Sequence, residues 1–377
     1  MRFIATADWQ LGMTAHYLDD EARPRFQQGR LDAVGRIAEV AKQYDAAFVI
    51  ACGDIFESNQ LDRAIVARTF EILRLFTVPV VLLPGNHDVL DASSIYNSAV
   101  FAARLPEHVH VLRDSTPFAV VPGAEIVGAP WFSKRPLLDL VAEACAQLEP
   151  TPTGVVRIIA GHGAVSTLNP DRDALAEIDV SALRMVLDEA RAHVAVLGDR
   201  HSTYEVDSRI WYPGTPEVTN RREDDPGNVL VIDVDVDDDE VKLEKVHVGG
   251  WAFIVVEERL DCIEDVELLE KRLQDLPDKN RTAVWLSLSG TLTTVANARL
   301  DSVLQEASEL FARLDHWRRH TDLAVIPDGH DFADLGLGGF AEKARDELTV
   351  LAGGSDQSAQ TAQDALGLLY RYSGGGR

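Results

Sequence analysis

The architecture of this chain is set by the segment Val78-Pro79-Val80-Val81-Leu82-Leu83-Pro84-Gly85-Asn86-His87-Asp88. An apolar run that is rich in Val and Leu and is closed by Pro-Gly predicts a buried strand that ends in a tight loop. Three polar residues, Asn86, His87 and Asp88, then stand together at the carboxyl end of this strand, where open α/β sheets bind their ligands. Gly, Asn and Asp also favour ordinary turns, so this segment alone leaves a plain turn open.

Similar polar residues follow four further apolar runs. These are residues 2–7 before Asp8-Trp9-Gln10, residues 46–52 before Gly53-Asp54, residues 155–160 before Gly161-His162, and residues 194–197 before Gly198-Asp199-Arg200-His201. Asp, Asn and His all serve as metal ligands. The same arrangement at five strand ends is hard to obtain from turns, and it predicts a shared metal site.

Helical patterns separate these runs. Apolar residues recur at helical spacing over 22–43 and 61–76, and the strand–helix–strand alternation indicates parallel strands with right-handed crossovers. The rest of this part predicts strands at 109–112, 118–121 and 125–127, a helix at 137–148, a loop at 164–178, a helix at 180–192, strands within 203–212 and 228–247, and a solvated acidic turn at 233–240. The predicted fold class is α/β, with two packed sheets flanked by helices.

The order and wording of the five motifs resemble the calcineurin-like metallophosphoesterases. Within that superfamily, Asp8-Trp9-x-Leu-Gly, Gly53-Asp-Ile-Phe and Gly85-Asn-His-Asp are similar to the SbcD-type DNA repair nucleases, and Tyr212-Pro-Gly-Thr resembles a Tyr-Pro-Gly-Ser turn in those enzymes. The resemblance implies a four-layer α/β/β/α metallophosphoesterase sandwich over residues 1–248. It also implies a smaller α/β capping domain at 249–326 and a linker with a helical C-terminal arm at 327–377.

The resemblance also implies a ligand set for two divalent metal ions. Carried onto the matching positions, it assigns Asp8, Gln10, Asp54 and His201 to the first ion, and Asp54, Asn86, His162 and Asp199 to the second. Asp54 bridges the two ions in this assignment. His87 is not a ligand, and we expect it to contact the scissile phosphate or to protonate the leaving oxygen, with Asp88 as its orienting partner.

Two positions depart from the family pattern. Gln10 stands where the family has His, and Asp199 stands where it has the first His of Gly-His-x-His. Both changes replace nitrogen ligands by oxygen ligands, which favours Mn²⁺ as the cofactor and leaves Mg²⁺, Fe²⁺ and Zn²⁺ open. The same departures leave open a catalytically weakened scaffold subunit.

Composition agrees with an ordinary globular protein of the cytoplasm. The 377 residues are 46% hydrophobic and 26% charged, and no run reaches the length of a membrane span. The N-terminus has no signal-peptide pattern. The three cysteines, Cys52, Cys145 and Cys262, lie far apart in the chain, which predicts free thiols in a reducing compartment.

The charge balance is unusual for a protein that acts on DNA. The chain has 36 Lys and Arg against 61 Asp and Glu, a net charge of −25, whereas nucleic-acid binders usually carry a basic patch. This balance argues against tight autonomous DNA binding, although a DNA substrate stays possible. It also leaves open a phosphoesterase that acts on small molecules or cyclic nucleotides.

The second part of the chain carries no catalytic motif. Strands at 252–256, 282–289 and 322–326, with helices at 263–273 and 295–314, predict a βαβαβ unit, and residues 327–340 a linker in which His330 is a loop residue. The tail holds two amphipathic stretches that either pack back on the chain or dock a partner. The resemblance implies docking to an SbcC-like coiled-coil ATPase, and homodimers that form through helices near 61–76 and 95–105.

Overall fold

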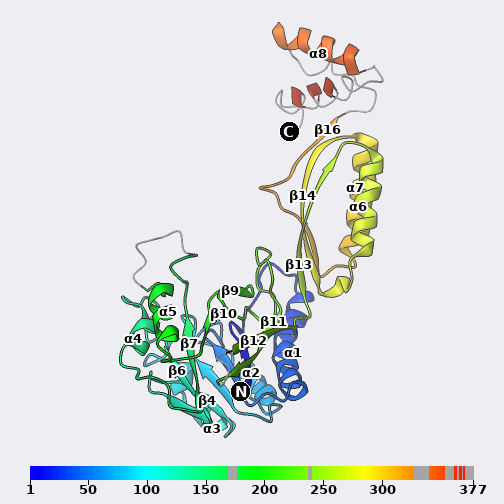
Figure 1. Cartoon of the computed structure of the whole chain (residues 1–377). Coiled ribbons are helices and arrows are strands. Elements are labelled where there is room, and N and C mark those ends of the chain that lie inside the picture. The colour runs from blue at the N-terminus through cyan, green and yellow to red at the C-terminus, as the bar shows by residue number, and fades with distance from the viewer. Residues whose placement is uncertain are drawn as a thin grey trace. The chain divides into compact units, whose positions relative to one another are not determined.

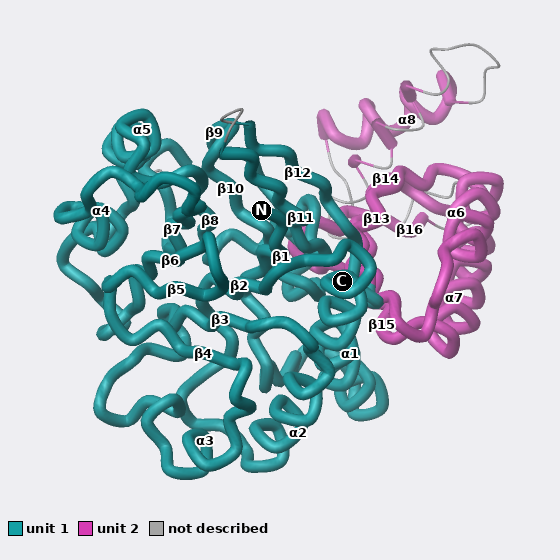
Figure 2. The backbone as a smooth tube through the Cα atoms, turned by 60° about the horizontal axis from the view of Figure 1, so that its bottom comes forward, with its two compact units in different colours: residues 1–251 teal, residues 252–377 magenta. Residues whose placement is uncertain are grey.

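The computed structural model describes residues 1–168, 176–236, 240–326 and 339–352, together with 361–362, 365–366 and 368–369. The chain forms two compact units, residues 1–251 and residues 252–377 (Figure 2). Residues 327–338 of the predicted linker at 327–340, with His330, and parts of the loop at 164–178 and of the tail, lie outside the described residues. The functional assignment of each segment stays a prediction.

The first unit is built on two six-stranded sheets. One has the order β12-β11-β1-β2-β3-β4, with β1 Arg2–Thr6, β2 Val49–Cys52, β3 Val80–Leu83, β4 Val109–Val111, β11 Asn228–Asp235 and β12 Glu240–His247. The other has the order β5-β6-β7-β8-β10-β9, with β5 Phe118–Val121, β6 Ala124–Gly128, β7 Val156–His162, β8 Val194–Gly198, β9 Tyr204–Asp207 and β10 Ile210–Tyr212. Strands β1 to β4 pair in parallel, as do β6 to β8.

Alternation along the strands divides the core into layers. In β1, Phe3 and Ala5 face the second sheet and contribute to a core that also contains Ile158 of β7, whereas Ile4 faces the opposite side. On that side the first sheet packs against α1 Ala22–Gln43, α2 Arg63–Leu73 and α3 Ala99–Arg104. The second sheet packs its outer face against α4 Leu140–Cys145 and α5 Val180–Asp188.

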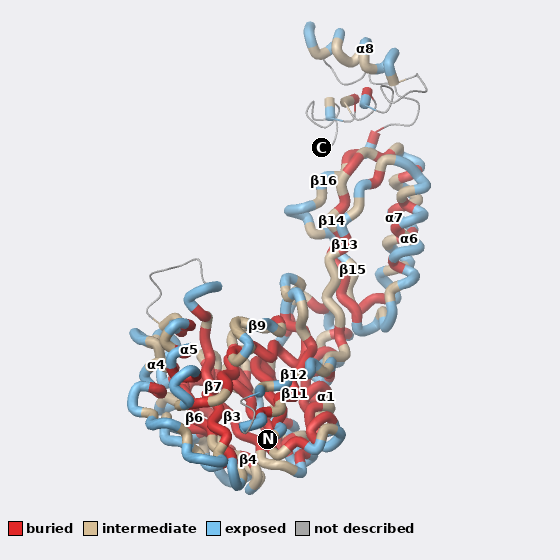
Figure 3. The backbone as a smooth tube through the Cα atoms, in the orientation of Figure 1, coloured by how far each residue is buried: buried red, intermediate tan, exposed pale blue. Residues whose placement is uncertain are grey.

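These layers confirm the predicted α/β/β/α sandwich. Figure 3 shows that the buried residues of the first unit follow the strands, while exposed residues lie on the outer helices and loops. One local prediction is wrong: Asp233 and Asp235 were expected in a solvated turn, but both belong to β11 and pair with Lys242 and Glu240 of β12. Both residues lie near the turn end of the hairpin, where strand pairing overrides the turn preference of aspartate.

The second unit is a four-stranded parallel sheet covered by two helices. Its strands are β13 Ala252–Leu260, β14 Thr282–Thr293, β15 Arg313–His316 and β16 Asp322–Ile326, and its helices are α6 Ile263–Asp275 and α7 Thr294–Ser308. The two helices run side by side over the sheet (Figure 1). The helix predicted at 295–314 is too long, because the chain leaves it at Ser308 and buries Phe311 and Ala312 before it forms β15.

The tail includes α8 Phe340–Ala352. A small apolar cluster joins Ile326 at the end of β16 with Leu366, Leu348 and Ala352, so one face of the described tail contacts its own unit. None of the helices in the described part of the chain has the length and apolar character of a membrane span.

Candidate metal centre

The predicted ligands gather where strands of the two sheets end. Asp8 follows β1, Asp54 follows β2 and Asn86 follows β3, while His162 closes β7 and Asp199 follows β8. Because β1 to β3 are parallel neighbours, as are β7 and β8, their carboxyl ends bring these residues to one edge of the sandwich.

The backbone at this edge takes uncommon conformations. Four of the eight non-glycine residues with positive φ in the described chain are predicted ligands, with φ of 53° at Asp8, 42° at Gln10, 52° at Asp54 and 94° at Asp199. Residues other than glycine rarely adopt a positive φ, and those that do concentrate at functional sites. The left-handed turns direct these side chains away from the pleat of each strand and toward the neighbouring strand ends.

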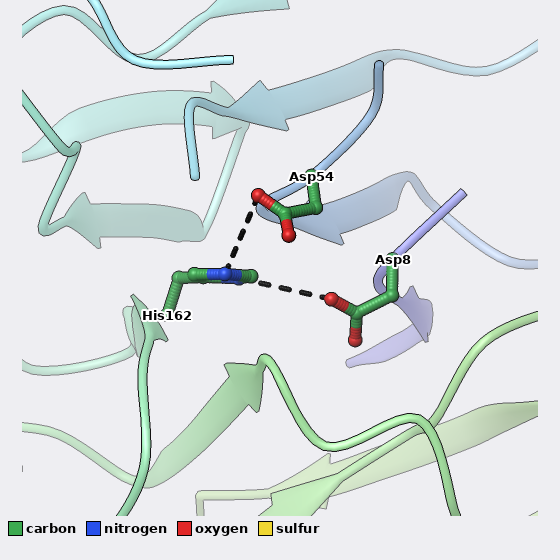
Figure 4. Close-up of side chains that lie close together, drawn as sticks. All are labelled: Asp8, Asp54 and His162. Carbon is green, nitrogen blue, oxygen red and sulfur yellow. Dashed lines mark ion pairs between the residues drawn. The ribbon is translucent and has the colours of Figure 1, made fainter. Parts of the chain in front are cut away.

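Asp8, Asp54 and His162 form the centre of the site. All three are buried, and one possible ligand atom from each lies within 4.8 Å of the others. His162 Nε2 is 3.4 Å from Asp54 Oδ1, and His162 Nδ1 is 4.0 Å from Asp8 Oδ1 (Figure 4). Two carboxylates and an imidazole, drawn from both sheets, are a donor set suited to divalent metal ions.

Asn86 and Asp199 complete this group. One terminal atom of the Asn86 amide lies 2.9 Å from His162 Nε2 and 2.9 and 3.0 Å from the two oxygens of Asp54, contacts that the amide nitrogen satisfies as a donor. Asp199 Oδ1 is 3.8 Å from His162 Nε2. The four residues predicted for the second ion are therefore side by side, although their role as ligands stays a prediction.

The hydrogen bonds of His162 orient its ring for ligation. Its Nδ1 is 3.0 Å from the carbonyl oxygen of Cys52, so this nitrogen is the donor in the neutral ring and Nε2 carries the free lone pair toward the carboxylates. Trp131 stands edge-on to the imidazole and donates from Nε1 to the His162 carbonyl at 2.7 Å. Such outer contacts fix both the tautomer and the direction of a metal-binding histidine.

His201 is held in the same manner beside Gln10. Its Nδ1 lies 2.7 Å from Thr219 Oγ1 and 2.9 Å from Glu223 Oε1, and its Nε2 lies 3.1 Å from Gln10 Nε2. The contact with Glu223 makes Nδ1 a donor and turns Nε2 into the site. Gln10 and His201, both predicted for the first ion, are thus neighbours.

Burial and charge act in opposite directions on the ionisable groups. Burial raises the pKa of Asp8 to about 7, against the opposing influence of His201 and His162. Burial also disfavours the charged form of Asp54, but His162 and His87 outweigh it and lower the pKa of Asp54. Burial lowers the pKa of His162, but the carboxylates of Asp54 and Asp8 outweigh it. The pKa of His162 therefore lies well above its usual range. A divalent cation would neutralise this concentration of acidic charge, so the donor set fits a metal centre.

His87 lies at the rim of the centre. Its backbone N–H donates to Asp54 Oδ1 at 2.9 Å, and its Nε2 is 3.8 Å from Asp54 Oδ2. The ring is oriented by Glu57, because Nδ1 is 3.0 Å from the Glu57 carbonyl and 3.8 Å from its carboxylate. With 38% of its side chain exposed, His87 can reach a bound substrate.

The expected contact between Asp88 and His87 is wrong. The buried carboxylate of Asp88 accepts hydrogen bonds from the Gly85 N–H at 2.7 Å, from the Phe56 N–H at 3.1 Å and from the Tyr96 hydroxyl at 2.6 Å. Burial raises its pKa to about 6. These bonds tie the loop after β3 to the loop after β2, so Asp88 positions both loops and does not orient His87.

Two glycines of the motifs are required by close approach. A Cβ at Gly53 would lie 2.0 Å from His162 Nδ1, and one at Gly198 would lie 1.8 Å from the Cys52 carbonyl oxygen. Gly53 also has a φ of +88°. The glycine before each aspartate therefore lets the strand ends of the two sheets come together.

Several supporting residues escaped prediction. Arg30 is buried in α1 and donates to the Trp9, Glu217 and Val218 carbonyls. The Thr215 hydroxyl donates to backbone carbonyl oxygens: its Oγ1 lies 2.9 Å from that of Asp8 and 2.8 Å from that of Glu217. The only signal for Thr215 was its place in the Tyr-Pro-Gly-Thr turn. For Glu223 and Arg30 the sequence carried none, since their partners lie far away in the chain.

A sandwich with carboxylate, amide and imidazole side chains gathered at its strand ends defines a metal-dependent hydrolase. Comparison with protein families matches residues 1–233 to Calcineurin-like phosphoesterase, and the chain therefore belongs to this family of metal-dependent phosphoester hydrolases. The family and the buried Asp8, Asp54 and His162 cluster fit a dinuclear site for divalent metal ions.

The chain was also compared with solved structures and with curated proteins. A protein from Thermus thermophilus has a TM-score of 0.41 and 12% identity, with 66% of this chain and 98% of that chain covered. A dimetal phosphatase from Danio rerio has a TM-score of 0.40 and 14% identity, with the same coverage of 66% and 98%. The comparison with curated proteins finds no match.

Proposed function

We propose that this protein is an SbcD-like nuclease subunit, a two-metal phosphodiesterase that cleaves DNA together with a coiled-coil ATPase. The observation that carries the proposal is the juxtaposition of the buried Asp8, Asp54 and His162 cluster with the half-exposed His87. A centre for metal ions next to a solvent-accessible imidazole suits hydrolysis of a phosphodiester that arrives from solvent.

The reaction divides between the metal ions and the protein. Two bound divalent ions would supply an ionised water and neutralise the phosphate oxygens. Asp8, Gln10, Asp54 and His201 would hold the first ion, and Asp54, Asn86, His162 and Asp199 the second. His87 would contact the phosphate and give a proton to the leaving oxygen, with Glu57 fixing its ring through Nδ1. Mn²⁺ is the metal we propose, because five of the seven ligands are Asp, Asn or Gln.

The DNA substrate is supported by the motif wording and by the second unit. Trp9 and Phe56, which distinguish the SbcD-like motifs, are fully buried, and Phe56 packs against Tyr96 and Phe101. These residues build the base of the metal loops and do not contact substrate. They support a close likeness of the loop framework. The unit formed by β13 to β16, to which we assign the capping role, has one strand, β15, more than the predicted βαβαβ order.

The partner is supported by charge and by exposed apolar side chains. A net charge of −25 leaves little attraction for DNA, so a partner that supplies DNA affinity fits the chain. On α8, the side chains of Phe340 and Val350 are 87% and 80% exposed, which favours docking of this helix on another protein. Exposed Leu75 after α2 and Val100 on α3 similarly support a homodimer through these helices. We place the assembly in the cytoplasm.

The test is cleavage of DNA by the full chain. The protein, loaded with Mn²⁺, is incubated with end-labelled double-stranded DNA, with and without the ATPase, and Asp54→Asn serves as the inactive control. We expect DNA shortening or nicking that the ATPase stimulates and that the control lacks. Turnover of bis(p-nitrophenyl) phosphate without DNA cleavage under either condition would refute the nuclease proposal and leave the phosphodiesterase intact.

A second candidate is a phosphoesterase for small molecules, including cyclic nucleotides. The same acidic charge favours it, because a small anion needs no extended basic surface. Hydrolysis of nucleotides in preference to DNA would support this candidate. A weakened scaffold, suggested by Gln10 and Asp199, predicts instead one bound ion or none and no turnover of either substrate.

A further inference from the structure

Arg200 is a cation next in sequence to two predicted metal ligands. It stands between two predicted ligands, Asp199 and His201, and its guanidinium carbon lies 4.4 Å from the centroid of the Tyr204 ring, over its face. Among the described residues it makes no hydrogen bond and no ion pair, and its buried Nε has no partner. Consecutive Cα atoms are about 3.8 Å apart, so the backbone of Arg200 lies at the border of the predicted centre.

An arginine that has no acidic partner among the described residues is notable in a chain with 61 acidic residues against 36 basic ones. Several other arginines of the unit are paired with acids, such as Arg157 with Glu125 at 2.7 Å and Arg2 with Asp233 at 2.7 Å. Arg200 instead rests on an aromatic ring that is 36% exposed at the edge strand β9. Its charge is therefore available to an anion from solvent.

Stacking on Tyr204 prepares the guanidinium for that anion. A ring face attracts the cation without using the N–H groups, which point outward in the guanidinium plane. The planar fork then matches two oxygens of one phosphate, which an ammonium group cannot do. Because the ring limits the rotamers of the long side chain, less entropy is lost when a phosphate binds.

We propose that Arg200 binds the phosphate next to the scissile one, with Tyr204 as its positioning residue. The inference rests on the proposed function, in which the substrate is a strand with successive phosphates. A substrate with one phosphate offers Arg200 no such contact. Arg200 therefore selects for polynucleotide substrates and compensates locally for the acidic charge of the chain.

The test compares two substrates on the full chain with Mn²⁺. A tetranucleotide offers a neighbouring phosphate, and bis(p-nitrophenyl) phosphate does not. Arg200→Ala is expected to raise KM for the tetranucleotide by about tenfold to a hundredfold, the effect of losing charge-assisted hydrogen bonds, with a smaller change in kcat and a clearly smaller change in KM for the other substrate. Arg200→Lys should recover less than half of the affinity for the tetranucleotide that Arg200→Ala loses. Tyr204→Phe should raise KM for the tetranucleotide less than Tyr204→Ala does.

The control is Arg2→Ala, which removes an equal charge at the amino end of β1, about 20 Å from Asp8 at a strand rise of about 3.3 Å per residue. It should leave both KM values unchanged. Metal content is measured for each variant. Equal losses on both substrates, full restoration by lysine, or loss of metal in Arg200→Ala would overturn the proposal.

An inhibition arm separates this inference from the nuclease proposal. Thymidine 3′,5′-bisphosphate competes with bis(p-nitrophenyl) phosphate in the wild type and in Arg200→Ala, and its inhibition constant should rise about tenfold or more in the variant. If the wild type fails to cleave the tetranucleotide, the DNA proposal fails, and this constant still decides the role of Arg200. An unchanged constant would overturn it.

Discussion

Replacing Arg30 by methionine should destabilise the first unit and weaken metal binding together. Arg30 lies in α1 and is only 1% exposed. Its guanidinium donates to the Trp9 carbonyl at 2.7 and 3.1 Å, to the Glu217 carbonyl at 3.1 Å and to the Val218 carbonyl at 3.2 Å. These bonds join the loop of Asp8 and Gln10 to the segment that carries Thr219, the partner of His201.

The magnitude follows from the groups left behind. Each buried carbonyl that loses its donor costs about 1–3 kcal/mol, and the three carbonyls share one donor group, so their costs do not add in full. Methionine keeps much of the volume, which limits any cavity. Three carbonyls whose costs add only in part put the loss at about 3–5 kcal/mol. For a unit of this size we expect a fall in Tm of about 6–20 °C.

The measurements are thermal unfolding followed by circular dichroism and calorimetric titration of the apoprotein with Mn²⁺. Arg25→Met is the matched control, because Arg25 is in the same helix and only pairs with Glu21 at the surface; it should change stability by less than about 0.5 kcal/mol. A relaxed Trp9 loop should lower the affinity of the first ion. Arg30→Met with a Tm within 2 °C of Arg25→Met, estimated from about 2–4 °C per kcal/mol, would refute this reasoning.

Four further predictions concern the centre and the tail. Asp54→Asn should abolish both metal loading, measured by elemental analysis, and turnover, because it removes charge from both predicted sites; near-normal activity would contradict the two-metal assignment. His87→Gln should keep the metal and lower turnover by about 10²–10⁴-fold, the usual contribution of a general acid, whereas loss of metal would make His87 a ligand. Gln10→His should tighten the weaker of two Mn²⁺ affinities in a titration, and an unchanged titration would remove Gln10 from the coordination shell. Deletion of 340–372 should spare hydrolysis of bis(p-nitrophenyl) phosphate and abolish co-purification with the ATPase, while aggregation would show that the arm belongs to the core of its own unit.

The layers of the fold were predictable because the buried strands have apolar sequences. In β2 and β3 each residue is apolar, which is what a strand covered on both faces requires. The helix at 22–43 was predicted with its observed bounds, since its apolar residues repeat at helical spacing. Strand β15, Arg313–His316, was missed because three of its four residues are polar and none is buried at the sheet edge.

The candidate site was predictable in its residues and less so in its contacts. The strand-end motifs predicted a shared site and the family resemblance implied which side chains meet; the structure brings Asp54, Asn86, His162 and Asp199 together. Contacts that depend on distant backbone could not be predicted. Asp88 bonds to Tyr96 and to the Phe56 N–H because the loops after β2 and β3 pack on each other, and no local pattern in the sequence records that packing.

The strained backbone of the site provides an independent reason to regard it as functional. A non-glycine residue in the left-handed region costs about 1–3 kcal/mol, so four such residues would cost a sizeable part of the usual 5–15 kcal/mol of net stability. The cost is offset by bonds between the same turns: the Asp8 N–H donates to the Gly53 carbonyl at 3.0 Å, and the Gln10 N–H donates to the Asp54 carbonyl at 2.8 Å. Because the turns hold one another, the carboxylates are positioned by the fold itself, and a bound cation would meet ligands that need little rearrangement.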